Sequence, residues 1–355
     1  MRPVIVALAL AVVAPACAGR DGDPRIEEYR PAAALDRLGF TVLEGDDIGL
    51  VGDFDIRGDT VFLLDRAGGV AVVERTGGSA RLVARFARRG PGPGEFLQST
   101  GMTATRSGVA VVDGTRLHFF SASGDPLSTT MVSLPCPIVL PAVAQSRTGL
   151  FVSGSCLRRG AASDTMKAVL IWSADTAVWQ VIIDAPRYTR DGTFGSVFGA
   201  RSLLTPGIDG VHAFGGGESN CIWRVHDEGE RPTATRECPV VASLYSGDPP
   251  PELKARMRAT RIPGLVLRWP EHLPVSLDRF ITSRGILLLR PFTTDSLVLQ
   301  LAGSVPRDIA VAPADGLLGC KAYGCLWLRD EGRSPQLIVL DRAEIERRIA
   351  AVPAP

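Results

Sequence analysis

Short runs of β-prone residues, bounded by Gly, Asp, Ser or Pro, follow one another along most of this chain. Residues 52–86 give the clearest example, because they divide into four such runs with a tight turn after each of the first three. The expected strands are Gly52–Ile56, Thr60–Asp65, Val70–Arg75 and Ala80–Phe86. Runs of this length and composition are typical of strands, and short turns join antiparallel neighbours. The segment therefore predicts a four-stranded antiparallel meander.

The same unit recurs along the chain with insertions of varying length. Three further four-stranded units are predicted within residues 102–132, 142–183 and 201–237. A fifth unit has no recognisable outer strand and consists of Leu277–Thr282, Ile286–Arg290 and Ser296–Leu301. A sixth also has three strands, Ile309–Ala312, Gly324–Arg329 and Gln336–Asp341. Four-stranded units repeated about every 40–50 residues are typical of β-propellers.

Phe40–Leu43 is a further β-prone run, and it lies before the first unit. Because the sixth unit lacks an outer strand, this run could complete it and remove the open edge of the array. We therefore predict an all-β fold, a six-bladed β-propeller of four-stranded antiparallel blades, closed by an N-terminal strand. It would occupy residues 39–342 as a single domain.

Two short helices are expected outside the strand pattern. Pro251–Thr260 follows a cluster of prolines and carries Glu252 in its first turn, which favours a helix start. It belongs to an insertion at 245–274, rich in Pro and Arg. Ala343–Ala350 is the second predicted helix, in a C-terminal segment at 343–355.

The N-terminus has the features of a signal peptide. Arg2 precedes the apolar stretch Val4–Val13, which is about ten residues long, whereas a membrane-spanning helix needs about 20. The following Ala14-Pro15-Ala16-Cys17 resembles a bacterial lipobox, in which the cysteine is lipidated. We predict a signal peptide at residues 1–16, a lipid on Cys17 and a tether and N-terminal segment at 17–38. The protein would then be a lipoprotein of the periplasm or outer membrane; simple secretion after cleavage is the alternative.

The number of cysteines also favours lipidation. Seven is an odd number for an exported chain, and lipidation of Cys17 leaves six for disulfides in an oxidising compartment. Two pairs follow from position, since one flanks a predicted hairpin and the other encloses four residues. The expected disulfides are Cys221–Cys238, Cys320–Cys325 and, joining consecutive units, Cys136–Cys156.

Composition and charge limit the classes of partner. The chain is 45% hydrophobic and 22% charged, which is too apolar for a disordered protein. Its net charge of +1 gives no overall field that would attract nucleic acid or anionic lipid. We expect no nucleic-acid partner, contact with the membrane through the lipid anchor at Cys17, and a monomer.

A loop after the first unit has an unusual sequence, Arg88-Arg89-Gly90-Pro91-Gly92-Pro93-Gly94-Glu95-Phe96. It resembles the Gly-Pro-Gly-Glu-Phe signature of bacterial six-bladed β-propeller proteins, a family similar to the NHL-repeat propellers. The resemblance implies a propeller fold and an exported or lipoprotein compartment, and it supplies no catalytic residues. The prolines and glycines predict a rigid connection in which Glu95 accepts backbone N–H bonds. A ligand-binding site formed by Arg88, Arg89 and Glu95 is the alternative.

The sequence gives little support to metal or nucleophilic chemistry. The four histidines, His118, His212, His226 and His272, are far apart, and His118 and His226 are expected on third strands, away from the axis. Asp53 and Asp55 share one face of an inner strand and could bind a cation weakly, although solvated aspartates are the favoured interpretation. No Gly-x-Ser-x-Gly motif is present. We predict no catalytic residues, no metal and no cofactor.

These observations favour a binding module of the cell envelope, with a protein, a glycan or a small molecule as its ligand. A hydrolase or lyase with its site in the propeller channel is the alternative. An enzyme would place convergent acids, bases or metal ligands at one end of the channel, whereas a binding scaffold would have a mixed polar and aromatic rim.

Overall fold

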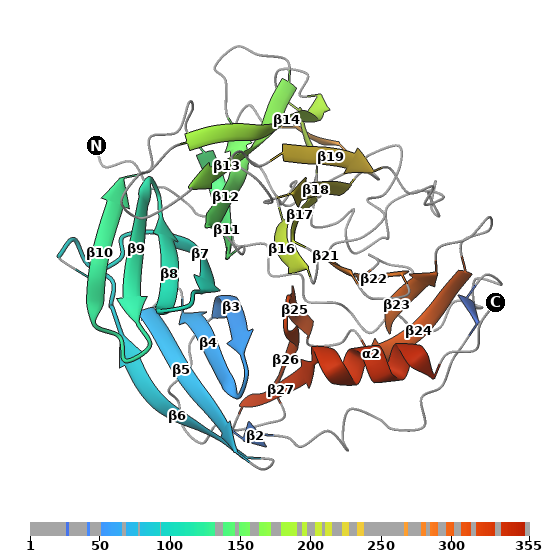
Figure 1. The fold of residues 1–355 in the computed structure, drawn as a ribbon, viewed down its shortest axis with the longest axis horizontal. Helices are drawn as coiled ribbons and strands as arrows, with labels where there is room; N and C mark the ends of the chain where they lie inside the picture. The colour runs from blue at the N-terminus through green and yellow to red at the C-terminus, as the bar shows by residue number, and fades with distance from the viewer. Residues whose placement is uncertain are drawn as a thin grey trace.

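A computed structural model describes two long stretches of the chain and a series of strands elsewhere (Figure 1). The stretches are residues 51–131, apart from 66–68, 77–78 and 93, and residues 317–351, apart from 331–334. Outside them the structure describes the backbone of individual strands, with few side chains, chiefly those of 143–145 and 149–152. The predicted signal peptide, Cys17 and the predicted helix at 251–260 lie outside the described residues.

The first sheet agrees with the meander predicted for residues 52–86. Its strands pair in chain order, each antiparallel to the next: β3 (Val51–Arg57), β4 (Thr60–Asp65), β5 (Gly69–Thr76) and β6 (Ser79–Phe86). The β3–β4 hairpin turns at Gly58, whose φ of 56° is accessible to glycine without strain. Every residue of β4 from Val61 to Asp65 is buried, which explains its nearly unbroken apolar sequence.

Three further sheets also consist of four antiparallel strands in chain order. The second contains β7 (Ser99–Ala104), β8 (Gly108–Asp113), β9 (Arg116–Ser121) and β10 (Pro126–Met131). The third contains β11 (Ile138–Gln145), β12 (Leu150–Cys156), β13 (Ser163–Ile171) and β14 (Trp179–Thr189). The fourth contains β16 (Leu203–Gly207), β17 (Gly210–Phe214), β18 (Ile222–His226) and β19 (Thr233–Glu237). These sheets confirm the four complete units expected from the sequence. A short parallel pair, β15 (Phe194–Ser196) and β20 (Val266–Arg268), lies apart from them.

The next sheet corrects the assignment of one strand. β21 (Asp278–Ile281), β22 (Gly285–Leu289) and β23 (Ser296–Leu301) are followed by β24 (Arg307–Pro313), which pairs with β23. The run Ile309–Ala312 is therefore the outer strand of the fifth unit and does not belong to the sixth. The sequence interpretation is wrong here because residue alternation identifies a strand without identifying its partner.

The last sheet begins with a strand that the sequence analysis missed. β25 (Leu317–Lys321) pairs with β26 (Gly324–Asp330), and β26 pairs with β27 (Pro335–Asp341). The segment between Cys320 and Cys325 is thus a tight hairpin, where the sequence interpretation has a loop.

Two short N-terminal strands add to these last two sheets. β2 (Thr41–Val42), inside the predicted run Phe40–Leu43, pairs antiparallel with β27 and supplies a fourth strand to the last sheet. β1 (Ile26–Glu27) pairs in parallel with β24, at the outer edge of the preceding sheet.

The four-stranded sheets are arranged around a common centre, with strands such as β3, β7, β11, β16 and β25 nearest to it (Figure 1). Apolar side chains fill the spaces between neighbouring sheets. Phe96 and Phe120 pack edge to face between the first and second sheets, with ring centroids 5.6 Å apart. Ile56 of the first sheet belongs to the same buried cluster as Leu326 of the last. This arrangement of radially packed meanders is that of a β-propeller.

Helix α2 (Arg342–Ala350) follows β27 directly and confirms the predicted C-terminal helix. Ile345 and Ile349, one turn apart, are completely buried, and the helix contacts β26 and β27. Asp341 stands at its N-cap without a side-chain capping bond, because its carboxylate accepts two hydrogen bonds from Arg75. Among the described residues no helix has the length and apolar character needed to cross a bilayer.

Candidate functional site

The 88–96 loop connects the outer strand of the first sheet to the inner strand of the second. It starts after Ala87, whose φ is 58°, and its ends are tied together by Gly90 N–H donating to Phe96 O (2.9 Å) and Phe96 N–H donating to Arg88 O (2.8 Å). Glu95 closes the loop from inside, since its carboxylate accepts bonds from the Gly92 N–H (2.8 Å) and from Arg88 Nε. These contacts, that of Arg88 first, hold the pKa of Glu95 below its usual value. The loop is therefore a hydrogen-bonded unit, with the role for Glu95 that the sequence predicts.

The three glycines of this loop serve different purposes. Gly94 alone among them has a positive φ, 73°, in the region that favours glycine. A Cβ at Gly92 would lie 2.8 Å from Glu95 Oε2, and a Cβ at Gly90 would overlap the same carboxylate. Gly90 and Gly92 thus leave room for Glu95, while Gly94 permits the turn.

Replacing Gly94 by valine is expected to lower the free energy of unfolding by about 1–3 kcal/mol, because a β-branched residue is strained at positive φ. The matched control is the double variant Arg88→Gln and Arg89→Gln, whose melting temperature should stay close to that of the wild type, since exposed charges contribute little. Calorimetry of both proteins makes the comparison. If Gly94→Val melted like the wild type and the double variant did not, the structural interpretation of the loop would be wrong.

Of the three predicted ligand-binding residues, the structure brings Arg88 and Glu95 into direct contact, and Arg89 lies next to Arg88 in the same loop. The side chain of Arg88 is 82% exposed although it bonds to Glu95, which is largely covered. Arg89 is exposed and its backbone bridges to Phe96. The loop therefore presents two arginines to solvent, and its carboxylate faces inward.

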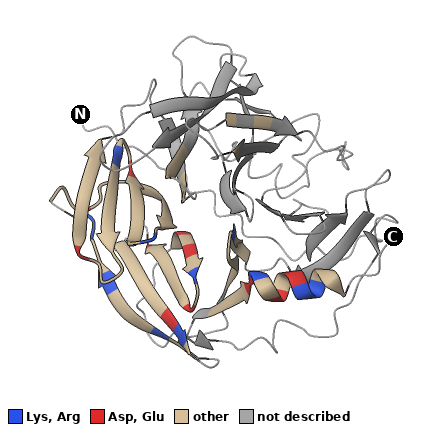
Figure 2. Ribbon diagram, in the orientation of Figure 1, with Lys and Arg blue, Asp and Glu red and all other residues tan. Residues whose placement is uncertain are grey.

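A second group of polar side chains lies on the inner strands, and we name it the inner-strand polar cluster: Asp53, Asp55, Thr103, Gln145 and Lys321. Figure 2 shows acidic positions on β3 and a basic position on β25 near the centre of the arrangement. Lys321 Nζ contacts Asp53 Oδ1 at 2.9 Å, and Asp53 Oδ2 accepts a bond from Met102 N–H at 2.8 Å. Asp53, on the first sheet, is thus bonded both to the last sheet, through Lys321, and to the second sheet, through Met102.

Asp55 occupies the same face of β3, two residues further along, and is only 3% exposed. Its carboxylate accepts bonds from Ile56 N–H (2.8 Å), Thr103 Oγ1 (2.9 Å) and Ala104 N–H (2.7 Å). Thr103 Oγ1 in turn accepts a bond from Gln145 N–H at 3.2 Å. The inner-strand polar cluster therefore links the inner strands of four sheets by side-chain hydrogen bonds and one ion pair.

The structure corrects the interpretation of these aspartates as solvated. Burial raises the pKa of Asp55 above its ordinary value, although Lys321 and the three hydrogen bonds act in the opposite direction. Asp53 is also mostly covered, with 17% of its side chain exposed. The alternation of the strand predicts their common face, while their partners, about 50 residues away in β7 and still further away at Lys321, carry no local signal.

His118 and His226 lie on third strands, as the sequence predicts. The His118 ring is buried against Phe96, its Nδ1 is hydrogen-bonded to Thr129 Oγ1 (3.0 Å), and its Nε2 lies 3.8 Å from Asp113 Oδ2. Burial lowers the pKa of His118 below its ordinary value and so favours the neutral ring. The carboxylate of Asp113 accepts hydrogen bonds from the backbone N–H groups of Leu97 and Gln98. His118 and Asp113 therefore contribute to the packing of the second sheet.

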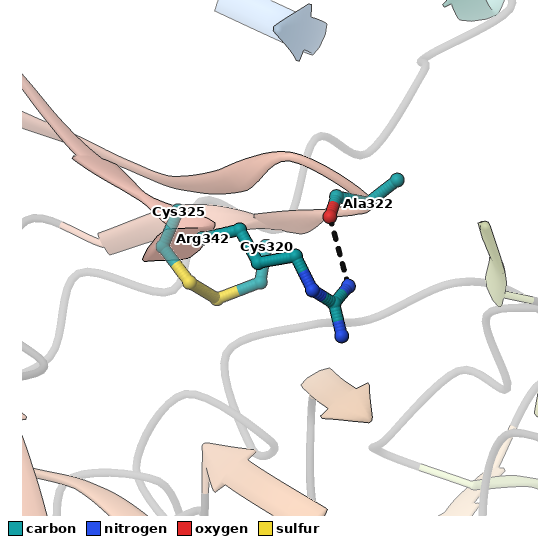
Figure 3. Close-up of a disulfide and its surroundings, with 4 residues drawn as sticks. All are labelled: Cys320, Ala322, Cys325 and Arg342. Carbon is teal, nitrogen blue, oxygen red and sulfur yellow. Dashed lines mark hydrogen bonds between the residues drawn. A yellow bond between two sulfur atoms is a disulfide. The ribbon is translucent and has the colours of Figure 1, made fainter. Parts of the chain in front are cut away.

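One of the predicted disulfides is present in the described part of the chain. Cys320 and Cys325 face each other across the β25–β26 hairpin, with Cα atoms 4.0 Å apart, and their sulfurs are bonded (Figure 3). Arg342 Nη1 donates to Ala322 O at the hairpin tip (3.0 Å), which ties the start of α2 to the same turn. The disulfide lies next to Lys321 and so braces the strand end that carries the ion pair with Asp53.

The structure does not describe the side chains of the other two predicted cysteine pairs. Cys136, Cys221 and Cys238 lie outside the described residues, and of Cys156 only the backbone, in β12, is described. The disulfides Cys136–Cys156 and Cys221–Cys238 remain predictions. Within the described residues no group of three or more His, Cys, Asp and Glu side chains is placed to hold a metal ion.

The fold and these contacts define an all-β protein of the β-propeller class, with its inner strands connected by buried polar side chains. No known family and no curated protein matches the sequence. Among solved structures, the chain is similar to the RRP9 WD40 repeats, with 12% identity, a TM-score of 0.43 and coverage of 86% of this chain and 98% of that one.

Two arabinanases are also similar to the chain. The α-L-arabinanase of Penicillium chrysogenum, solved with arabinobiose, has 10% identity and a TM-score of 0.41 over 86% of this chain and 98% of its own. The GH43 endo-arabinanase of Bacillus licheniformis has 13% identity and a TM-score of 0.29 over 84% and 95%.

Proposed function

We propose that this protein is an exported, lipid-anchored β-propeller that acts as a ligand- or protein-binding module of the cell envelope. The observation that carries the proposal is the inner-strand polar cluster. Its carboxylates, those of Asp53 and Asp55, are engaged by backbone N–H groups, by Thr103 and by Lys321. A carboxylate with such partners serves to fix the sheets against one another, and a rigid scaffold is the basis on which surface loops recognise ligands.

The propeller would have six blades in a closed ring, of the type that resembles the NHL-repeat family. Two contacts between the first and last sheets support closure: the Lys321–Asp53 pair near the centre and the bidentate Arg75–Asp341 pair, at 2.9 and 3.2 Å. The pairing of β2 with β27 supports it further, since it covers the outer edge of the last sheet.

Replacing Cys17 by serine is expected to transfer the protein from the membrane fraction to the soluble fraction of a bacterial cell. The lipid is the proposed attachment to the membrane, and removal of the acylated thiol eliminates it. Fractionation and immunoblotting measure the change, and mass spectrometry of the N-terminal peptide identifies the acyl chains. The control is Arg20→Gln in the same segment, which should leave the protein in the membrane. A wild type that is unmodified and already soluble would remove the anchor from the proposal.

One experiment distinguishes a binding module from an enzyme. The purified Cys17→Ser protein is incubated with panels of glycans, peptides and small polar metabolites. A binding module is expected to raise its melting temperature with a ligand that is recovered unchanged. Recovery of a cleaved ligand would instead favour the channel-site hydrolase or lyase. The exposed Arg88 and Arg89 are the first positions to change when a ligand is found, with Arg116 of β9, also exposed, as the matched control.

A further inference from the structure

We infer that the sheet β21–β24 faces the membrane, so that the first and second sheets, with the 88–96 loop, are held on the far side. The inference rests on the proposed lipid anchor and adds to it the orientation of the propeller. Its physical basis is the short length of chain between Cys17 and the first strand.

Only eight residues, 18–25, separate Cys17 from Ile26, the first residue of β1. A fully extended chain of this length spans at most about 30 Å. Its distal end is fixed, because Ile26 and Glu27 pair with Asp308 and Ile309 of β24. The lipid-bearing residue therefore lies within about 30 Å of the outer edge of one particular sheet.

The same constraint would be much weaker without β1. In the part of the chain that the structure describes, the next paired strand is β2, which starts at Thr41, and a free chain from Cys17 to that point reaches up to about 80 Å. β1 thus shortens the effective tether by more than half. It also moves the attachment point to β24, which lies across the centre from the second sheet (Figure 1).

The occupant of this edge is the lipid bilayer, since the anchor brings the edge to the membrane surface whatever the protein's other partners are. The exposed arginines of the 88–96 loop belong to the connection between the first and second sheets, on the opposite part of the ring. They would face away from the bilayer and be accessible to a soluble or surface-bound ligand.

The test places a genetically encoded fluorophore either at Ser304, which lies in the sequence between β23 and β24, or at Ser128 on the exposed strand β10. Each labelled protein, purified from membranes with its acyl chains, is reconstituted into phosphatidylcholine vesicles that contain a headgroup quencher. Quenching at Ser304 is expected to exceed that at Ser128 by at least about twofold, because the short tether limits the distance of only the first.

The matched variants change β1 and nothing else. Ile26→Pro with Glu27→Pro removes the backbone donors of β1 and should reduce the quenching at Ser304 to the value at Ser128. Ile26→Val with Glu27→Gln keeps the strand and should retain the difference. Equal quenching at both positions in the lipidated wild type would overturn the orientation while leaving the anchor intact. A wild type that carries no lipid by mass spectrometry would overturn both proposals.

Discussion

Replacing Asp55 by alanine is expected to lower the free energy of unfolding by about 3 kcal/mol or more, measured by urea denaturation in the soluble Cys17→Ser background. The change leaves three donors without their acceptor: Ile56 N–H, Ala104 N–H and the Thr103 hydroxyl. Each is inside the protein, where an unsatisfied donor costs about 1–3 kcal/mol. The loss should therefore exceed that of a typical surface substitution several times over.

The matched control is Asp59→Ala, which removes another aspartate near the same strand. Asp59 is exposed in the β3–β4 turn, and its substitution should change the free energy of unfolding by no more than about 0.5 kcal/mol. Thr103→Val tests the mechanism separately, because its effect should not add to that of Asp55→Ala if the two groups act through one hydrogen bond. Additive effects, or an Asp55→Ala protein as stable as the control, would contradict a connecting role for this carboxylate.

Removing the Cys320–Cys325 disulfide by replacing both cysteines with alanine is expected to cost about 2 kcal/mol of unfolding free energy. The short loop restricts the unfolded chain only modestly, which sets this value near the lower end for disulfides. Both cysteines are buried, so the protein should also lose some packing. Denaturation of the double variant is preferred to reduction of the wild type, because a reductant would also cleave the other two predicted disulfides.

Tyr323→Ser is the matched control on the same hairpin. Its side chain is 57% exposed at the turn, and its loss should have little effect. If native peptide mapping found free thiols at 320 and 325, or if the double alanine variant unfolded at the wild-type denaturant concentration, the disulfide would have no stabilising role.

The strands of the first four sheets could be predicted because their local signals are strong. Buried β-branched runs such as Val109–Asp113 end at glycine-containing turns, and neighbours in the sheet are neighbours in the chain. The signals fail where a strand has a neighbour in the chain on either side and could pair with either one. The sequence predicts a strand at Ile309–Ala312, but residue alternation does not show whether this strand pairs with β23 or with the strand that follows it.

The contacts of the candidate site could likewise be predicted where the residues are close in sequence, and could not where they are far apart. Glu95 and its loop are close in sequence, so the bond to the Gly92 N–H could be anticipated from composition and spacing. The contacts of Asp53 and Asp55 with Met102 and Ala104 of β7 could not, because the donors are backbone N–H groups and every residue other than proline carries one. Lys321 had no motif around it, and only the fold places it beside Asp53.

The pairing of β2 with β27 has a consequence for the order of events during folding. Thr41 and Val42 emerge early in synthesis, whereas their partners Leu337 and Gln336 are near the end of the chain. The last sheet therefore cannot be completed until β27 has been synthesised, and until then the side of the first sheet that packs against it stays uncovered. Contacts of such large sequence separation make folding slow and leave apolar surface exposed in the meantime. Two segments that are far apart in the sequence must therefore meet before this sheet is complete.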